Sequence, residues 1–322
     1  NLALFPKGLE DATARTRVFY DARGFITEAD IVLNPYLQFS TDGTIGTFDL
    51  ESTVTHELGH LLGLAHSPVF GATMNQSQGR NGTFNLPAFS ARTLAADDIA
   101  AIRSLYGPAE NEDGCCSRIS GRLNAGPKAA TNYTVWVEDQ ETGRVLAAVT
   151  TSADGSFRLG GLDAGRVEVF AQSDLDDSTN SSAVDLGPYT ISAKQPVVIT
   201  KKIDSVVMES KPEYLGFNGQ LAGLSVPINS GSTYDLAIGG TDFTRKPDVG
   251  SDSALISVRN SPVRGTYVNG LTTLGFYVSA APETPVGEYS LFVQFETGAR
   301  RYLIGGLSVE KYPNFWSVAP LK

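Results

Sequence analysis

The segment from His56 to Ser67 reads His-Glu-Leu-Gly-His-Leu-Leu-Gly-Leu-Ala-His-Ser, and it contains all three histidines of the chain. Residues four apart on an α-helix project from the same face one turn apart, so His56 and His60 can reach one metal ion. Zinc binds neutral imidazole, and a catalytic zinc site typically has three protein ligands and a water. Glu57 lies beside the first histidine, where it can take a proton from that water.

His66 follows His60 by six residues, and on a continuing helix it would point about 240° away. The helix must therefore end between them. Gly63 lies at that point, and glycine readily adopts the left-handed conformation that ends helices. The chain can then turn back, which predicts one Zn²⁺ held by His56, His60 and His66, with Glu57 as the general base.

This spacing of three histidines, a glutamate and Gly63 resembles the elongated zinc motif of the metzincin peptidases. That clan has a methionine in a tight turn after the third histidine, and the segment 72–75, Ala-Thr-Met-Asn, matches it. Ser67, directly after the third histidine, resembles the matrixin (matrix-metalloproteinase-like) branch. The segment 94–107 resembles the last helix of matrixin catalytic domains.

The resemblance implies supporting roles for further residues. Gly63 makes the break after the helix, Met74 packs beneath the metal, and Ser67 belongs to the same structural support. The resemblance also implies that Asp97 or Asp98 braces the methionine turn. For these two aspartates, helix capping and first-turn charge are the alternative.

Length and composition limit the class of protein. A chain of 322 residues suggests two or three domains, and 41% hydrophobic residues suffice for packed cores. The net charge of −10 argues against nucleic acid or an anionic membrane as the main partner. No stretch approaches the 18 or more apolar residues of a membrane span.

The beginning of the chain shows no signal peptide, and its first residue is Asn1 rather than methionine. Matrixin catalytic domains carry a strand, a long helix and further strands before the zinc helix. Only 55 residues precede His56 here. We therefore expect a processed product or a fragment whose peptidase domain is incomplete at its N-terminus.

The residues before the zinc helix predict a hairpin, with strands at 17–20 and 25–33 around a turn at 21–24. The resemblance implies that an edge strand pairs with an extended substrate, and either 25–33 or 37–40 suits this role. The matrixin loop with accessory zinc and calcium ligands has no clear counterpart between Asn34 and Gly46. Asp49 is predicted to be the N-cap of the zinc helix, with calcium ligation as the minor alternative.

The segment 75–93 is polar, and in matrixins the corresponding segment lines the pocket for the substrate residue after the cut. Its apolar residues Leu86, Pro87 and Phe89 are the predicted pocket wall. Gly107 and Pro108 predict a sharp stop, followed by an acidic linker.

Cys115 and Cys116 are adjacent at the end of this linker. Their Cα atoms would be about 3.8 Å apart across a trans peptide, below the usual range for a disulfide of about 4.4–6.8 Å. A vicinal bridge, partners outside this sequence and two free thiols remain as alternatives.

The remaining residues predict short strands separated by turns, at 119–123, 134–138, 145–150, 156–159, 167–170, 213–219, 233–240, 254–258, 273–278 and 289–295. Residues 150–171 resemble carboxypeptidase regulatory-like β-domains, and the surroundings of residues 239–243 resemble an immunoglobulin-like IPT/TIG module. Acidic and polar residues from Asp174 to Asp185 fall in a calcium-loop register, although a solvated acidic loop is the default interpretation.

The sequence therefore predicts a multidomain chain, in which an α+β metzincin-type peptidase domain precedes two all-β immunoglobulin-like sandwiches. The predicted limits are 1–108 for the peptidase domain, 109–117 for the linker, and 118–204 and 205–322 for the sandwiches.

The predicted function is that of a secreted zinc metalloendopeptidase, which cleaves extracellular proteins through a zinc-bound water and Glu57. Its expected cofactor is one Zn²⁺, with Ca²⁺ only weakly supported. Its partners are protein or peptide substrates, and the β-domains are candidates for binding extracellular protein or polysaccharide. The alternative is a secreted binding or adhesion protein with an inactive peptidase unit; a zinc hydrolase of other substrates fits Met74 and Ser67 less well.

Overall fold

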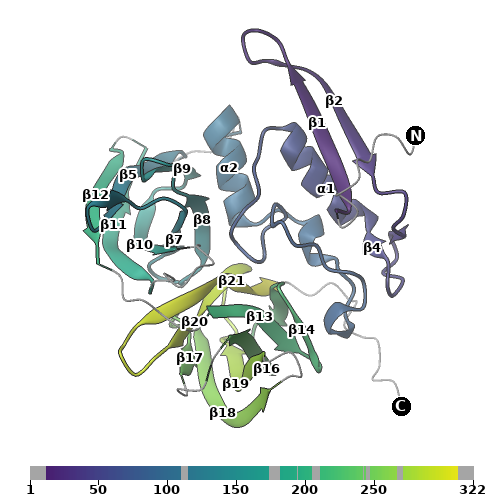
Figure 1. Ribbon diagram of the computed structural model, residues 1–322, viewed down its shortest axis with the longest axis vertical. Helices are drawn as coiled ribbons and strands as arrows, with labels where there is room; N and C mark the ends of the chain where they lie inside the picture. Colours follow the sequence, from purple (N-terminus) through teal and green to yellow (C-terminus); the bar gives the residue numbers. More distant parts are fainter. Residues whose placement is uncertain are drawn as a thin grey trace.

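The computed structural model describes residues 12–109, 115–173, 182–193, 195–204, 211–241, 243, 247–266 and 271–310. These residues form three groups of elements that follow one another along the chain and pack together (Figure 1). We call them the N-terminal unit (12–109), the second unit (115–204) and the third unit (211–310). The two α-helices of the described residues lie in the N-terminal unit, and the other two units contain only β-strands.

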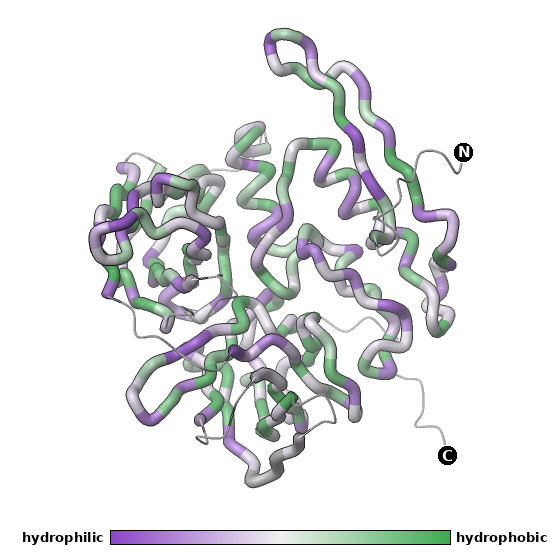
Figure 2. Tube along the Cα trace, in the orientation of Figure 1, coloured by the Kyte–Doolittle hydropathy of each residue, from purple (hydrophilic) through white to green (hydrophobic). Residues whose placement is uncertain are grey.

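The N-terminal unit begins with a hairpin that projects from the molecule, in which β1 (Ala14–Tyr20) pairs antiparallel with β2 (Ile26–Leu33). The Asp21 carboxylate closes its turn by accepting the N–H groups of Arg23 and Phe25. Hydrophobic and hydrophilic residues are interleaved along this hairpin (Figure 2). The antiparallel pairing of β1 with β2 confirms the predicted hairpin.

The rest of the N-terminal unit consists of short strands and helices. They are β3 (Phe39–Ser40), β4 (Phe48–Asp49), α1 (Leu50–Leu61), the 3-10 helices η2 (Thr83–Asn85) and η3 (Ser90–Arg92), and α2 (Ala96–Tyr106). The prediction of a last helix within 94–107 is confirmed by α2. Both helices that the sequence predicts are therefore present.

The second unit contains two sheets. Its strands are β5 (Ser117–Ala125), β6 (Lys128–Ala129), β7 (Tyr133–Asp139), β8 (Val145–Thr150), β9 (Ser156–Leu162), β10 (Gly165–Ser173), β11 (Val184–Ile191) and β12 (Val197–Ile203). One sheet has the order β11-β10-β7-β8, and the other has β12-β5-β6 with β9 paired to β5. Apolar side chains from both sheets share one core.

The third unit also contains two sheets, with the orders β14-β13-β16-β19-β18 and β15-β21-β20-β17. Its strands are β13 (Lys211–Phe217), β14 (Gln220–Ala222), β15 (Val226–Asn229), β16 (Thr233–Thr241), β17 (Asp248–Gly250), β18 (Ile256–Thr266), β19 (Thr272–Ala280), β20 (Gly287–Gln294) and β21 (Arg300–Glu310). Phe84 of the N-terminal unit lies in the core that these sheets share.

All ten strands predicted after the linker overlap strands of the structure, so the β-rich character of this region is confirmed. An immunoglobulin-like topology and the domain limits stay predictions. Most of the proposed calcium loop, Asp174 to Asn180, lies outside the described residues. Cys115 and Cys116 form a vicinal disulfide, with Cα atoms 3.1 Å apart because the peptide between them is cis.

A third apolar cluster joins the units to one another. Val69 and Ala95 contribute from the N-terminal unit, Trp136 and Phe170 from the second, and Tyr302 from the third. The Trp136 ring stacks on Phe170 and also contacts Tyr302, each at 5.1 Å between centroids. This explains why β7 is buried on both faces, since Trp136 faces the third unit while its neighbours in the strand face the core of the second.

A buried carboxylate lies beside this cluster. Glu138 is 3% exposed, and its Oε1 accepts hydrogen bonds from Trp136 Nε1 at 2.9 Å and from Ser290 Oγ of the third unit at 2.6 Å. Burial raises the pKa of Glu138 from 4.5 to about 7, although the two hydrogen bonds oppose this rise.

This raised pKa predicts a pH-dependent stability. Between pH 4.5 and about 7 the unfolded chain releases the Glu138 proton while the folded chain retains it, so the folded state loses stability as the pH rises. Relative to Glu138→Gln, which keeps the accepting oxygen, the free energy of unfolding of the wild type should fall by about 3 kcal/mol over this interval. Urea unfolding at several pH values measures it. Glu141→Gln, in the exposed turn nearby, is the control, and an equal dependence in both variants would contradict the prediction.

Candidate metal centre

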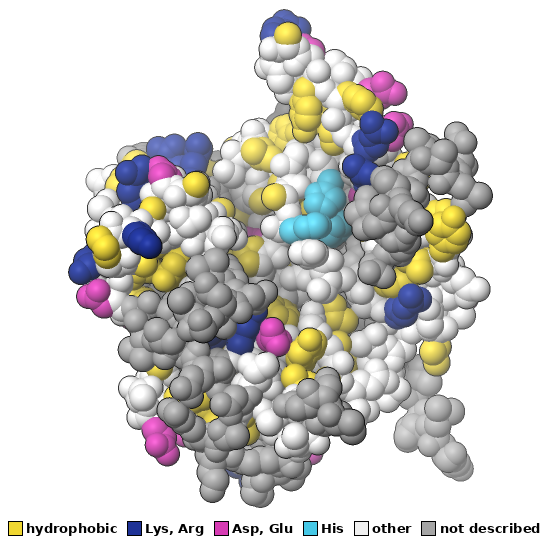
Figure 3. All heavy atoms as spheres, viewed as in Figure 1, with side chains coloured by type: hydrophobic (Ala, Val, Ile, Leu, Met, Phe, Trp, Pro, Cys, Tyr) yellow, Lys and Arg dark blue, Asp and Glu magenta, His cyan; other side chains and the backbone are white. Residues whose placement is uncertain are grey.

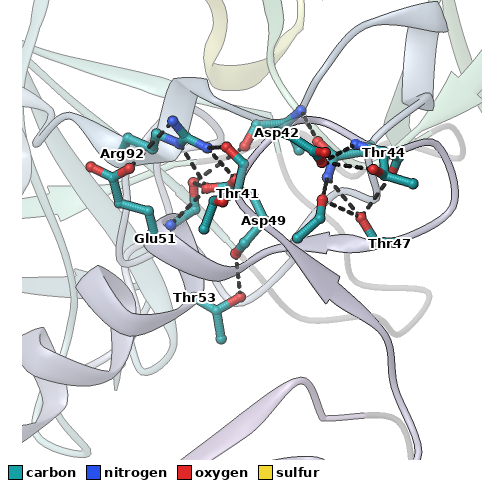
Figure 4. Close-up of polar contacts among 12 residues, drawn as sticks. Thr41, Asp42, Thr44, Thr47, Asp49, Glu51, Thr53 and Arg92 are labelled. Carbon is teal, nitrogen blue, oxygen red and sulfur yellow. Dashed lines mark hydrogen bonds and ion pairs between the residues drawn. The ribbon is translucent and has the colours of Figure 1, made fainter.

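Helix α1 begins at a fixed N-cap. Asp49 is 2% exposed, and its Oδ2 accepts the N–H of Ser52 at 2.9 Å. Arg92 donates to both carboxylate oxygens, at 2.9 and 2.6 Å (Figure 4). Burial alone would raise the pKa of Asp49, but the hydrogen bonds from Arg92 and Ser52 hold it below the usual value. The predicted N-cap role is confirmed, and the carboxylate is occupied by these donors rather than arranged for calcium.

The end of α1 is fixed at Gly63, as predicted. Gly63 adopts a φ of +92°, where a side chain would be strained, and its N–H bonds to the carbonyl of His60 at 3.0 Å. The Tyr106 hydroxyl of α2 donates to the free carbonyl of Leu62 at 2.9 Å. The chain therefore turns away from α1 at Gly63 and then comes back, so that His66 lies beside His56 and His60.

The structure brings His56, His60 and His66 together, with one ring nitrogen of each within 4.8 Å of the others. The three ring centroids are 4.7, 4.8 and 5.3 Å apart. His56 is buried, His60 is partly exposed and His66 is exposed. Figure 3 shows the histidine side chains reaching the surface near the base of the β1–β2 hairpin.

Backbone carbonyls fix the orientation of two of the rings. His56 Nδ1 lies 2.8 Å from the carbonyl of Thr73, and His60 Nδ1 lies 2.8 Å from the carbonyl of Leu64. Because a carbonyl can only accept, each Nδ1 carries the hydrogen, and each Nε2 presents a lone pair. This is the usual arrangement around a metal-binding histidine.

The donor set suits zinc. His60 Nε2 and His66 Nε2 are 3.2 Å apart, and two nitrogens bound tetrahedrally at about 2.0–2.1 Å would be about 3.4 Å apart. Burial lowers the pKa of His56 and of His66, and the neighbouring His60 lowers both further. The neutral imidazole that a metal requires is therefore favoured at both positions.

Glu57 follows His56 on α1 and is 3% exposed. Thr16 of β1 donates its hydroxyl to Glu57 Oε2 at 2.5 Å, and the same hydroxyl lies 3.0 Å from the Glu57 carbonyl. Thr16 was not among the predicted site residues. A single threonine gives no indication that it will bind Glu57, because β1 and α1 meet only in the folded chain.

The methionine turn lies beneath the histidines. The N–H of Asn75 bonds to the carbonyl of Ala72 at 3.0 Å, and Met74 is 3% exposed. The Asp98 carboxylate of α2 accepts the N–H groups of Thr73 at 2.9 Å and of Met74 at 3.1 Å. Asp98 is thus the aspartate that braces this turn.

Asp97 has a different role from its neighbour. Its Oδ2 accepts the Ser67 hydroxyl at 2.6 Å, and its Oδ1 accepts the N–H of Ala148 in β8 at 2.7 Å. Ser67 therefore supports the loop after His66 and does not face the metal centre. Burial raises the pKa of Asp97 to about 7, and the hydroxyl and N–H donors oppose this.

The predicted pocket wall of Leu86, Pro87 and Phe89 stays a prediction. Leu86 and Pro87 line a cavity of about 90 Å³ beside α1. The Phe89 ring does not line this cavity and lies 3.8 Å from the Arg92 guanidinium, which donates to Asp49. We call this space the α1 cavity.

Comparisons with known proteins identify the same region. Residues 19–107 match the matrixin family model. The chain is 45% identical over 76 residues to metalloendoproteinase 5-MMP of Arabidopsis thaliana, covering 22% of this chain and 18% of that protein. It is 36% identical over 96 residues to metalloendoproteinase 1 of Glycine max, covering 28% and 25%. It is 39% identical over 64 residues to interstitial collagenase of Bos taurus, covering 20% and 12%.

The chain thus spans a quarter or less of the length of these relatives. Among solved structures, the major pilin subunit of Bacillus cereus matches with 10% identity and a TM-score of 0.23, covering 58% of this chain and 67% of that one. A TM-score this low establishes neither a shared fold nor a shared function.

The packing of Met74 predicts the effect of one substitution. A Cβ at Gly59 would overlap the sulfur of Met74. Gly to Ala within a helix normally stabilises it by about 1 kcal/mol, but Gly59→Ala should displace the end of the Met74 side chain and weaken zinc binding. Competition with a chromophoric chelator measures the affinity. Leu58→Ala, at a half-exposed neighbouring position, should leave it unchanged; equal affinities for both variants would contradict the prediction.

Proposed function

We propose that the N-terminal unit is a zinc metalloendopeptidase that hydrolyses peptide bonds in extracellular proteins. The observation that carries the proposal is the convergence of three imidazoles on one point, with the Glu57 carboxylate next to the first of them on α1. The match of residues 19–107 to the matrixin family supports the same assignment.

His56, His60 and His66 would hold one Zn²⁺ through their ring nitrogens. When bound, zinc polarises a carbonyl oxygen and makes a water molecule more acidic. Orientation of the ligands and proton transfer are the tasks of the protein's own groups. The ligand rings keep their orientation because the carbonyls of Thr73 and Leu64 hold the Nδ1 hydrogens of two of them.

Glu57 is the proton carrier in this proposal. Thr16 occupies Oε2 of the carboxylate, which leaves Oε1 to take the proton from the attacking water. The same oxygen then gives the proton to the amide nitrogen of the departing segment as the C–N bond breaks. Thr16 is a positioning residue, since its hydroxyl fixes the carboxylate rotamer without contacting the substrate.

The proposal includes secretion of the protein and a role for the two β-strand units. None of the described helices is long and apolar enough to span a membrane. The second and third units are proposed to bind extracellular protein or polysaccharide and to hold the peptidase unit near its substrates.

The role of Glu57 predicts a separation of metal binding from turnover. Glu57→Gln should keep about one zinc per chain and lower kcat on casein or gelatin by about 10²- to 10⁴-fold, because the proton acceptor is removed while the ligands remain. Zinc content by atomic absorption and initial rates with and without a chelator provide the measurement. Glu51→Gln, the same change at an exposed position of α1, should stay within about twofold of the wild type.

Two results would separate the competing functions. Retained turnover in Glu57→Gln would remove Glu57 from the mechanism. A wild-type chain that binds zinc and cleaves neither denatured protein would instead favour a binding or adhesion protein with an inactive peptidase unit.

A further inference from the structure

The α1 cavity has a wall that does not belong to the N-terminal unit. Leu224, Ser225 and Pro227 of the third unit line it together with residues of α1 and of the loop that follows the methionine turn. They come from the connection between β14 and β15 and from β15 itself. More than 130 residues separate this wall from the rest of the cavity in sequence, so the third unit completes a space beside the metal centre.

The third unit also contacts the loop after the methionine turn, which supplies much of the cavity lining. Phe84 is 3% exposed and packs in the core of the third unit, with its ring 6.4 Å from that of Phe217. The N–H of Phe84 donates to Gln220 Oε1 at 2.8 Å, and its carbonyl accepts from Asn218 Nδ2 at 2.7 Å. Both hydrogen-bonding groups of this loop residue are therefore satisfied by the β13–β14 hairpin.

Leu224 is fixed closely against the same loop. A Cβ at Gly79 would lie 2.7 Å from Leu224 Cδ1, so the two residues approach each other closely. Leu224 also packs against the apolar core of the third unit. Its side chain therefore contacts both the loop and the core of its own unit.

The cavity lies next to the first histidine. Its lining includes Thr53, which precedes His56 by one helical turn, and Thr73, whose carbonyl fixes the His56 ring. Apolar side chains such as Phe70, Leu86 and Pro87 share the remaining lining with polar ones, Asp49, Gln78 and Arg80 among them. None of the three histidines lines the cavity itself, so a substrate side chain would enter it past Thr53 and Thr73.

We propose that Leu224 is a specificity-determining residue, which closes the pocket for the apolar substrate side chain next to the cleaved bond. The third unit then sets the size of side chain that the N-terminal unit accepts. This inference rests on the proposed peptidase function. It extends that function by giving a residue of a β-strand unit a direct role in substrate choice.

Truncation of this wall gives the first test. With the full chain loaded with zinc, kcat/KM is measured on two peptides that differ only in leucine or tryptophan after the cleaved bond. Leu224→Ala should raise the tryptophan-to-leucine ratio at least about tenfold, since one or two methylenes in an apolar pocket change discrimination by this much or more. Leu224→Met, of similar volume, should keep the ratio of the wild type.

Leu221→Ala is the matched control. Leu221 lies three residues earlier and packs against Gly216 and Gly239 of the third unit, outside the lining of the cavity. It should keep the wild-type ratio. An unchanged ratio in Leu224→Ala, or an equal change in Leu221→Ala, would overturn the proposal.

A second measurement does not depend on catalysis. Indole is titrated into the zinc-free full chain, and its binding is followed through the amide resonances of Thr53 and Thr73. Leu224→Ala should bind indole about tenfold more tightly than the wild type and than Leu221→Ala. If no variant cleaves any peptide, the proposed function fails, while equal indole affinities would by themselves overturn the assignment of Leu224 as the wall.

Discussion

The carboxylate of Asp98 is the point on which the arrangement of the N-terminal unit depends. It accepts three backbone N–H groups, from Thr73 and Met74 of the methionine turn and from Ala95 at the start of α2. The turn that it fixes presents the Thr73 carbonyl to His56 and the Met74 side chain to Gly59. Burial raises the pKa of Asp98, and hydrogen bonds from these N–H groups and from the Thr73 side chain oppose this rise. Loss of this one group would release the histidine, the turn and the helix end together.

The same helix connects the metal centre with the β-strand units. Asp97, beside Asp98, joins Ser67 to the N–H of Ala148 in the second unit. Phe84 places a loop of the N-terminal unit inside the core of the third unit. The cluster around Trp136 then joins all three units through apolar contacts. These contacts hold the N-terminal unit against both β-strand units.

Several features of the site could be predicted because they depend on contacts between residues close in sequence. The helical spacing of His56 and His60, the N-cap at Asp49 and the break at Gly63 are of this kind, and the structure has each of them. The choice between Asp97 and Asp98 could not be made, because both lie in the first turn of α2 and only their tertiary contacts differ. Thr16 and Leu224 were not identified either, since each meets the site from a distant part of the chain.

The strands of the fold, like the residues of the site, could be predicted only in part. Ten of the described strands after the linker were predicted, whereas β6, β11, β12, β14, β15, β17 and β21 were not. The longest of the strands that were missed is β21, Arg300–Glu310. It is buried on both faces and contains two adjacent glycines, so it has neither the alternation nor the composition that marks a strand. It pairs with β20 as a hairpin across residues 295–299, whereas its pairing with β15 joins residues far apart in sequence.

The central claim is that His56, His60 and His66 together bind one catalytic zinc ion. X-ray absorption at the zinc edge of the purified full chain tests it most directly. The account predicts about one zinc per chain, with three imidazole nitrogens and one further oxygen at about 2.0–2.1 Å and no sulfur. A chain without bound zinc, or a spectrum with sulfur at about 2.3 Å from Cys115 or Cys116, would contradict it.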